Sequence, residues 1–227
     1  ASPTCVMNFE DAEGWLMGEP HRGMRSMFVM MNTARLNVGA EGTALAEIAY
    51  QTALEFAKER RQSRSLNPKL RDTNEKADNI LVHPDVRRML MNIKATNEGM
   101  RALLYWTAMQ LDKSTHHPDT VIREKAANDV ALFTPVIKSF LTERGCELIS
   151  EAMQVCGGAG YTQDWSIEQY FRDARIAMIY EGTNHIQALD LVGRKLPMKN
   201  GALLKQFTEK VESFVKEHQA KEELHTL

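Results

Sequence analysis

The chain has few cysteines and no long apolar run. Its 227 residues include Cys5, Cys146 and Cys156, an odd number at wide spacing. A disulfide framework uses an even set of cysteines, so these three are predicted to be free thiols in a reducing compartment, and a cytoplasmic protein is expected. No apolar stretch approaches the roughly 20 residues that cross a membrane as a helix. The sequence therefore predicts no membrane span.

An excess of charge of either sign is also missing. Lysine and arginine total 28, aspartate and glutamate total 30, and the formal net charge is −2. A nucleic-acid or anionic-membrane partner is usually attracted by a positive field, and this composition indicates neither.

Clusters of side chains that could bind a metal ion are scarce as well. His116 and His117 form an adjacent pair without further ligands at suitable spacing, which is more typical of a solvated loop than of a metal site.

Apolar residues recur with a helical period along most of the chain. Only the N-terminus differs, where "CVMNF" and "WLMGE" are typical of two short strands and predict a β-hairpin remnant of a preceding β-domain over residues 1–19. Helices are predicted over residues 20–62, 83–114, 120–155, 166–179, 184–196 and 202–227, with Pro135 expected to kink the third or to mark a junction. A polar stretch from Ser63 to His83 predicts a long surface loop. The predicted fold class is all-α, a bundle of long antiparallel helices.

The first predicted helix carries a stripe of small residues. Within the stripe, apolar or small side chains recur every three or four positions at Leu36, Gly39, Ala40, Thr43, Ala46 and Tyr50. An internal glycine costs a helix about 1 kcal/mol relative to alanine, so close approach by a neighbouring helix or a flat ligand is expected at this stripe.

Several polar candidates have ordinary explanations when each is taken singly. "ERRQSR" at 59–64 fits a helix end whose cations compensate the helix dipole, and less often an anion site. Gly157 and Gly158 follow a helix and not a strand, so they indicate a helix terminus and not the dinucleotide-binding fingerprint. Glu181 lies in "YEGT" between two predicted helices, where Thr183 can cap the second one. The order of these features is more informative than any one of them.

Residues 154–187, "QVCGGAGYTQDWSIEQYFRDARIAMIYEGTNHIQ", resemble the C-terminal signature of acyl-CoA dehydrogenases, flavoenzymes that desaturate acyl-CoA thioesters. Residues 34–62 resemble the family helix that begins near an arginine and ends in a Glu-Arg element. The similarity covers about 14–196, and "VHPDVRRMLMNIKA" and "IQALDLVGRKL" are most similar to the longer methylthiopropionyl-CoA dehydrogenase-like branch. The resemblance implies a helical domain over 20–196 and the start of a C-terminal extension over 197–227, in a chain shortened at both ends.

The resemblance also assigns roles around the acyl-CoA substrate. It implies that Glu181 removes the α-proton of the thioester while the β-hydrogen leaves as hydride to FAD. A base that works near neutral pH needs a raised carboxylate pKa, which burial beside an acyl chain and a flavin would provide. Gly182 would leave room for the thioester, Arg35 matches the family arginine near the CoA region, and Thr183 would lie toward the phosphates of FAD.

A second group of residues is implied to bind FAD from a neighbouring subunit: Arg60, Gln62, Gln154, Gly157 and Gly158. Guanidinium pairing with pyrophosphate explains the arginine. A homo-oligomer, either a dimer or a tetramer, is therefore expected, with an electron-transfer flavoprotein as a candidate redox partner. Ser63 and Arg64 replace the aromatic-glycine pair that many relatives have after the Glu-Arg element.

Two alternatives stay open at this point. An acyl-CoA oxidase would share Glu181 but pass its electrons to oxygen, and a non-catalytic helical assembly module would keep the helices without using the carboxylate. The family's flavin also rests on a middle β-domain and an N-terminal helical domain. The 227-residue chain alone is therefore expected to fold but to bind FAD weakly and turn over nothing.

Overall fold

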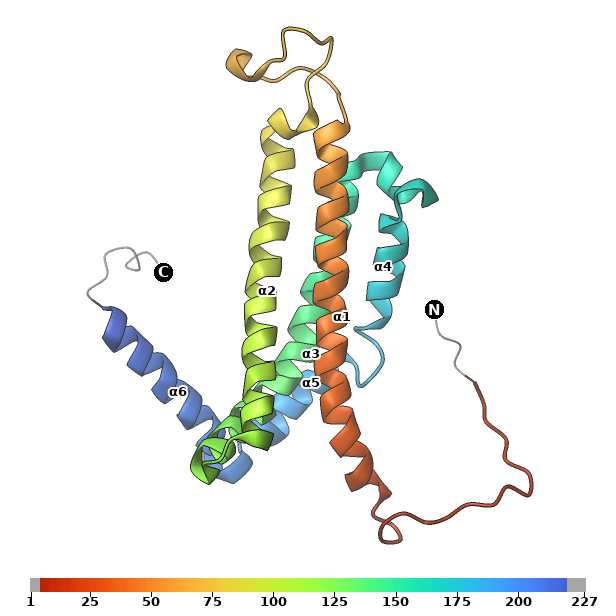
Figure 1. Ribbon diagram of the computed structural model, residues 1–227, viewed down its shortest axis with the longest axis vertical. Coiled ribbons are helices and arrows are strands. Elements are labelled where there is room, and N and C mark those ends of the chain that lie inside the picture. The colour runs from red at the N-terminus through yellow and green to blue at the C-terminus, as the bar shows by residue number, and fades with distance from the viewer. Residues whose placement is uncertain (1–4, 220–227) are drawn as a thin grey trace.

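The computed structural model describes residues 5–219 and shows a bundle of three long helices, with shorter helices beside it and a last helix that projects from its base (Figure 1). The long helices are α1 (Gly23–Glu59), α2 (Pro84–His116) and α3 (Thr120–Cys156). The shorter ones are α4 (Ile167–Ile176), α5 (Asn184–Asp190), a π-helical segment (Leu191–Lys195) and α6 (Met198–His218). Single 3-10 turns span Pro68–Leu70, Ile80–Val82, Gly157–Tyr161 and Gln163–Trp165. No sheet occurs in residues 5–219, which confirms the predicted all-α class.

The helix ends follow local capping chemistry. Pro84 occupies the first turn of α2, where its missing N–H would have no partner. The Asp119 carboxylate accepts from the backbone N–H of Val121 at 2.7 Å and begins α3. Gly157 ends α3 with φ of +57°, a conformation that costs glycine little. The predicted start at 120 is confirmed, and α2 begins one residue after the predicted start at 83. α3 continues without a junction through the buried Pro135.

α1 and α3 cross at glycines with very little space between their backbones. A Cβ added to Gly42 would lie 2.6 Å from the Leu141 carbonyl oxygen, and one added to Gly145 would lie 2.5 Å from the Gly42 carbonyl oxygen. One added to Gly39 would meet Ile137 Cγ2 at 2.6 Å. The small-residue stripe of α1 therefore admits a neighbouring helix, as the sequence predicts. Within the described residues, no helix combines the length and apolarity needed to cross a membrane.

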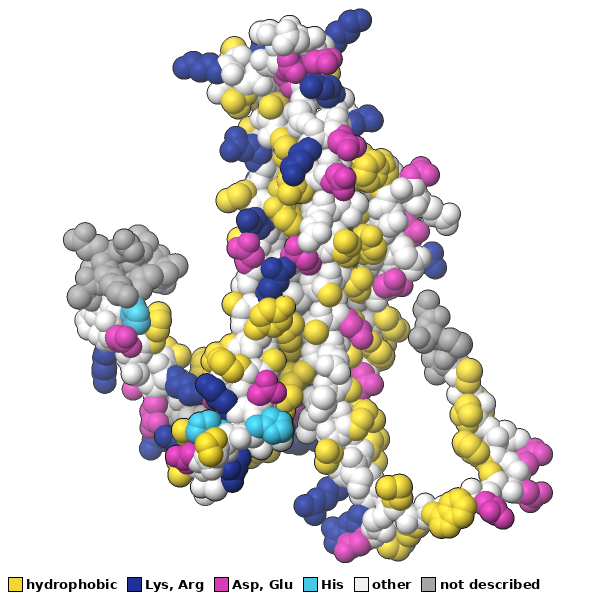
Figure 2. Space-filling view, in the orientation of Figure 1, with side chains coloured by type: hydrophobic (Ala, Val, Ile, Leu, Met, Phe, Trp, Pro, Cys, Tyr) yellow, Lys and Arg dark blue, Asp and Glu magenta, His cyan; other side chains and the backbone are white. Residues whose placement is uncertain are grey.

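The N-terminal segment differs from its prediction. Residues 5–22 form no strand and run away from the bundle (Figure 1), and their apolar side chains are exposed (Figure 2) at Val6, Met7, Phe9, Trp15, Leu16 and Met17. The predicted β-hairpin is thus not formed. An isolated two-stranded hairpin is marginal in water, and this segment has no sheet to join. The first helix also begins at Gly23 instead of Pro20 and ends at Glu59 instead of Gln62.

The C-terminal helices also depart from the expected pattern. The predicted helix 184–196 is α5 followed by the π-helical segment. Left-handed backbone at Lys199, Asn200 and Gly201 kinks the chain at the start of α6. The buried Asp129 of α3 then holds α6, because it accepts hydrogen bonds from Gln206 and pairs with Lys210. The domain boundaries at 19 and 196 stay predictions.

Candidate functional site

Glu181 lies in a tight turn between α4 and α5. Its φ is +58° and that of Gly182 is +83°, so both residues are left-handed. For a glutamate this conformation is uncommon and costs about 1–3 kcal/mol, which the surrounding structure must offset. A Cβ at Gly182 would lie 2.8 Å from Gln187 Nε2. The glycine is therefore needed both for its backbone conformation and for the close approach of Gln187.

Two buried side chains hold the main chain of this turn. Arg35 of α1 donates from Nε to the Glu181 carbonyl oxygen at 3.4 Å and from Nη1 to Asp190 Oδ2 at 3.2 Å. Gln187 of α5 donates from Nε2 to the carbonyl oxygens of Glu181 at 3.3 Å and Gly182 at 3.1 Å. Arg35 is only 4% exposed, so in this chain its contacts go to the turn and to α5.

The Glu181 side chain is half-buried, and its carboxylate is not tied down. Its Oε2 is buried without a hydrogen-bond partner among the described residues, and so is Oε1 of Gln187. Lys138 of α3 lies nearby and donates to Asn184 Oδ1 at 3.0 Å. Burial lowers the pKa of Lys138 to about 8, the positive charge of Arg35 adds to this effect, and the negative charge of Glu181 opposes it. The charge of Glu181 thus acts on one buried cation, Lys138, while a second, Arg35, contacts its carbonyl oxygen.

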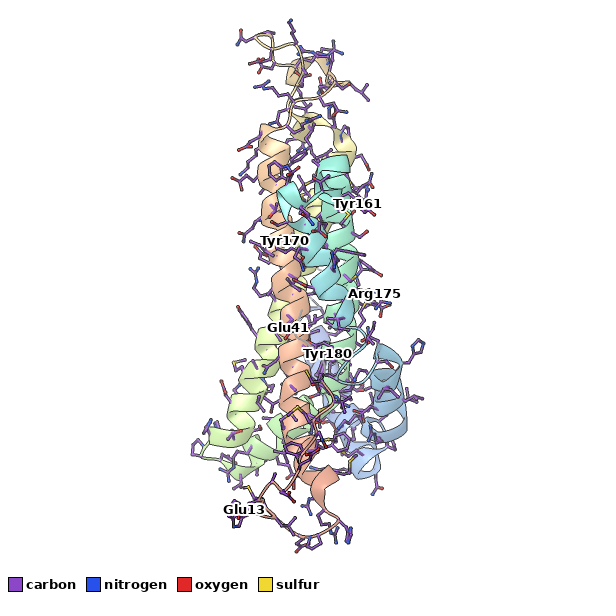
Figure 3. The ribbon with its side chains drawn as sticks, turned by 90° about the vertical axis from the view of Figure 1, so that its right-hand side faces the viewer. Glu13, Glu41, Tyr161, Tyr170, Arg175 and Tyr180 are labelled. Carbon is purple, nitrogen blue, oxygen red and sulfur yellow. The ribbon has the colours of Figure 1, made fainter. Side chains whose placement is uncertain are left out.

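Tyr180 precedes Glu181 and is directed to α1. Its hydroxyl donates to Glu41 Oε2 at 2.6 Å (Figure 3). Desolvation raises the pKa of Tyr180 to about 12, and the hydrogen bond to Glu41 acts in the same direction. This contact ties the turn to α1 on its exposed side.

The predicted cofactor residues gather in a different place, at the C-terminal ends of α1 and α3 beside the start of α2. A depression of about 780 Å³ there is lined by Phe56, Arg60, Gln62, Ser63, Ile80, His83, Val86, Gln154, Val155, Cys156, Gly157, Gly158 and Ala159. A Cβ at Gly157 or Gly158 would meet no atom within 4 Å, so the backbone of this turn faces open space. The exposed Arg60 guanidinium contacts Gln62 Oε1 at 3.4 Å. The depression thus offers a cation, an amide and an accessible glycine turn.

The loop after α1 is anchored by a buried carboxylate. Asp78 is 0% exposed and accepts from the backbone N–H groups of Ser65 at 2.6 Å and Asp72 at 2.7 Å. The hydrogen bond from Ser65 lowers the pKa of Asp78, and the Arg64 guanidinium at 3.1 Å acts in the same direction. The Gln62 N–H donates to the Asp78 carbonyl oxygen at 2.9 Å. Arg64 therefore helps to fix the loop that carries Gln62.

Thr183 is not among the residues that line this depression. It caps α5 by accepting from the Ile186 N–H at 3.3 Å. Together with His185 and Arg175 it lines a separate depression of about 470 Å³. The His185 side chain is exposed on α5. The structure therefore brings together five of the six predicted cofactor residues and leaves Thr183 beside Glu181.

Comparison with known proteins identifies the family. The profile described as "Acyl-CoA dehydrogenase, C-terminal domain" matches residues 21–196. The chain belongs to the acyl-CoA dehydrogenase family. It is 44% identical over 211 residues to a 3-methylmercaptopropionyl-CoA dehydrogenase of Ruegeria pomeroyi, covering 93% of this chain and 35% of that protein. A broad-specificity linear acyl-CoA dehydrogenase of Mycobacterium tuberculosis is 39% identical over 222 residues, covering 94% of this chain and 36% of that protein.

Solved structures agree on the fold of this family domain. Caenorhabditis elegans ACDH-11 in complex with C11-CoA superimposes with a TM-score of 0.77 at 22% identity, over 91% of this chain and 32% of that one. The chain spans about a third of the length of the curated acyl-CoA dehydrogenases given above.

Sequence reasoning missed four side chains around the turn of this acyl-CoA dehydrogenase domain: Glu41, Lys138, Asn184 and Asp190. One signal was present, because Lys138 interrupts the apolar run "PVIKSFL" where a core position is expected. Glu41 lies on the exposed side of α1, outside the small-residue stripe, and nothing in the sequence marks it. Nothing in the sequence marks Asn184 or Asp190, since their partners lie on distant elements.

Proposed function

We propose that the chain is the C-terminal helical domain of an FAD-dependent acyl-CoA dehydrogenase, in which Glu181 removes the α-proton of an acyl-CoA thioester. The observation that carries this proposal is the half-buried Glu181 carboxylate, whose Oε2 has no donor among the described residues while its main chain is fixed. A carboxylate oxygen free of hydrogen bonds keeps its lone pairs available to accept a proton.

The turn would also supply a donor for the substrate carbonyl. The backbone N–H of Glu181 would donate to the thioester oxygen and stabilise the charge that develops there, an oxyanion-type effect. Gly182 offers no side chain that would block the thioester, while Arg35 and Gln187 hold the carbonyl groups of Glu181 and Gly182. When bound, the flavin would supply the acceptor for the β-hydrogen, which leaves as hydride.

The depression that contains Arg60 fits a pyrophosphate-bearing group such as FAD. An exposed guanidinium is a suitable partner for phosphate oxygens, and the open turn at Gly157 and Gly158 lets a ligand approach the backbone. Gln62 and Gln154 add amide donors on the same wall. The depression shares no lining residue with the turn, which supports binding of the FAD of a neighbouring subunit and hence a homo-oligomer.

The 227-residue chain alone is proposed to turn over nothing. Its acyl-CoA dehydrogenase relatives are nearly three times as long, so most of the surface that would enclose a flavin and an acyl chain belongs to other segments. A saturable yellow flavin complex of this chain, bleached by an acyl-CoA, would contradict that expectation.

Glu181→Gln in the full-length holoenzyme tests the function. The expected result is loss of acyl-CoA-dependent flavin bleaching by orders of magnitude under anaerobic conditions, with flavin content unchanged. Glu98→Gln is the matched control, because Glu98 is exposed on α2 and pairs with Lys94 across one turn. A non-catalytic assembly module would be indifferent to both substitutions.

A second experiment separates an oxidase from a dehydrogenase. After reduction of the wild type by substrate, an oxidase should be reoxidised by air, and a dehydrogenase by an electron-transfer flavoprotein.

A further inference from the structure

Lys138 is an unusual core residue. It lies in the middle of α3 with 0% of its surface exposed, although lysine is almost never fully buried unless it is paired. Burying an ammonium group costs several kcal/mol before any compensation. A core position that only had to fill space would be served better by a methionine or a leucine.

The ammonium group contacts the residue that begins α5. Lys138 Nζ donates to Asn184 Oδ1 at 3.0 Å, and the Thr142 hydroxyl reaches the same oxygen at 3.4 Å. Asn184 in turn donates from Nδ2 to the Ser139 carbonyl oxygen at 3.3 Å. Its backbone N–H donates to the Met178 carbonyl oxygen at 3.2 Å. Asn184 is therefore held by α3 on one side and closes the turn that contains Glu181 on the other.

The neighbouring charges leave one carboxylate without a salt-bridge partner. Arg35 of α1 pairs with Asp190 of α5 at 3.2 Å, and Arg194 pairs with the other oxygen of Asp190 at 2.7 Å. Among the described residues, Glu181 forms no salt bridge, yet its charge acts on Lys138. The charged groups around Lys138 are thus Arg35, Glu181 and, through Arg35, the pair of Asp190 and Arg194.

We infer that Lys138 is a positioning residue for the reaction: its ammonium group holds the turn that carries Glu181 through a charge-assisted hydrogen bond to Asn184. This inference rests on the proposed function of Glu181. It explains why an expensive buried cation is kept where a neutral side chain would pack at lower cost. The position is then retained for activity at the expense of stability.

Lys138→Met in the full-length holoenzyme tests the inference, with Lys94→Met on the surface of α2 as the control. We expect kcat to fall at least 10-fold, the KM for acyl-CoA to change less than 3-fold, and the thermal midpoint to stay equal or rise. In the wild type, kcat should decline above about pH 8, where Lys138 loses its proton, and this decline should be missing in Lys138→Met. Lys138→Arg, which keeps the charge, should recover part of kcat.

Unchanged kcat and an unchanged pH profile in Lys138→Met would overturn the inference. A parallel loss of kcat, bound flavin and thermal stability with the wild-type pH profile would indicate a merely structural role and would overturn it too. If Lys138→Met does not fold, Asn184→Ala decides, since it breaks the same link and should also lower kcat at least 10-fold. Failure of the proposed function is distinguishable, because Glu181→Gln would then stay active.

Discussion

Replacing Gly42 by alanine is expected to destabilise the bundle by about 2 kcal/mol, although alanine is the better helix former. The new Cβ would lie 2.6 Å from the Leu141 carbonyl oxygen and 3.0 Å from Thr142 Cα. Ordinary contacts begin near 3.4 Å, and both neighbours are backbone atoms that cannot rotate away, so α1 and α3 must separate. Overpacking of this kind costs about 1–3 kcal/mol, here at the upper end, while the gain in helix propensity is about 1 kcal/mol.

Gly99 provides the matched control. It lies on the exposed side of α2, and a Cβ there would meet no atom within 4 Å. Gly99→Ala should therefore gain about 1 kcal/mol from helix propensity alone. Gly145→Ala should resemble Gly42→Ala, because its Cβ would lie 2.5 Å from the Gly42 carbonyl oxygen.

Urea denaturation followed by circular dichroism at 222 nm measures these differences, provided that the variants share one denaturant slope. The reasoning predicts a gap of about 3 kcal/mol between the free energies of unfolding of Gly99→Ala and Gly42→Ala. It is refuted if Gly42→Ala is as stable as Gly99→Ala.

Three further outcomes are expected. Asp78→Asn should weaken the loop that it anchors by about 2 kcal/mol, because charge-assisted hydrogen bonds are lost, and limited proteolysis of the loop should become faster. A thiol reagent should modify the exposed Cys5 rapidly but Cys146 and Cys156 only on unfolding. Both of the latter are buried, and burial raises the pKa of Cys156 to about 11. Rapid modification of all three cysteines would contradict the burial of Cys146 and Cys156. The pKa of Lys138 is about 8 in the folded state and 10.5 ordinarily, so the unfolded state binds more protons between these pH values. The free energy of unfolding of the wild type should therefore rise with pH across this window, and that of Lys138→Met should not. Urea titrations at several pH values would show the difference.

Local chemistry made much of the fold predictable. The starts of α2, α3 and α5 follow from Pro84, Asp119 and Thr183, whose capping roles depend only on neighbours in the chain. The small-residue stripe of α1 predicted a closely packed neighbour, because the spacing of small residues within one helix is visible in the sequence. That this neighbour is α3 could not be predicted, because the choice depends on how three helices pack together.

The errors have a common physical origin. The hairpin was expected from strand propensity, but strands need a partner sheet, and residues 5–22 contact none. The helix 184–196 was expected to be regular, yet Leu191–Lys195 is π-helical. At the site, Glu181 and the Arg60 group could be named from the order of motifs, whereas the link from Lys138 to Asn184 joins residues 46 positions apart. The roles of the site residues stay predictions.

The glycine crossing of α1 and α3 has a consequence for evolution of the site. Arg35 precedes Gly42, and Lys138 precedes Gly145, by two helical turns, which is about 10 Å along each axis. Because α1 and α3 run in the same direction (Figure 1), their glycine contact fixes the positions of Arg35 and Lys138 relative to each other along the two helices. A lineage that enlarged either glycine would change how these two cations are placed around the Glu181 turn without replacing any charged residue.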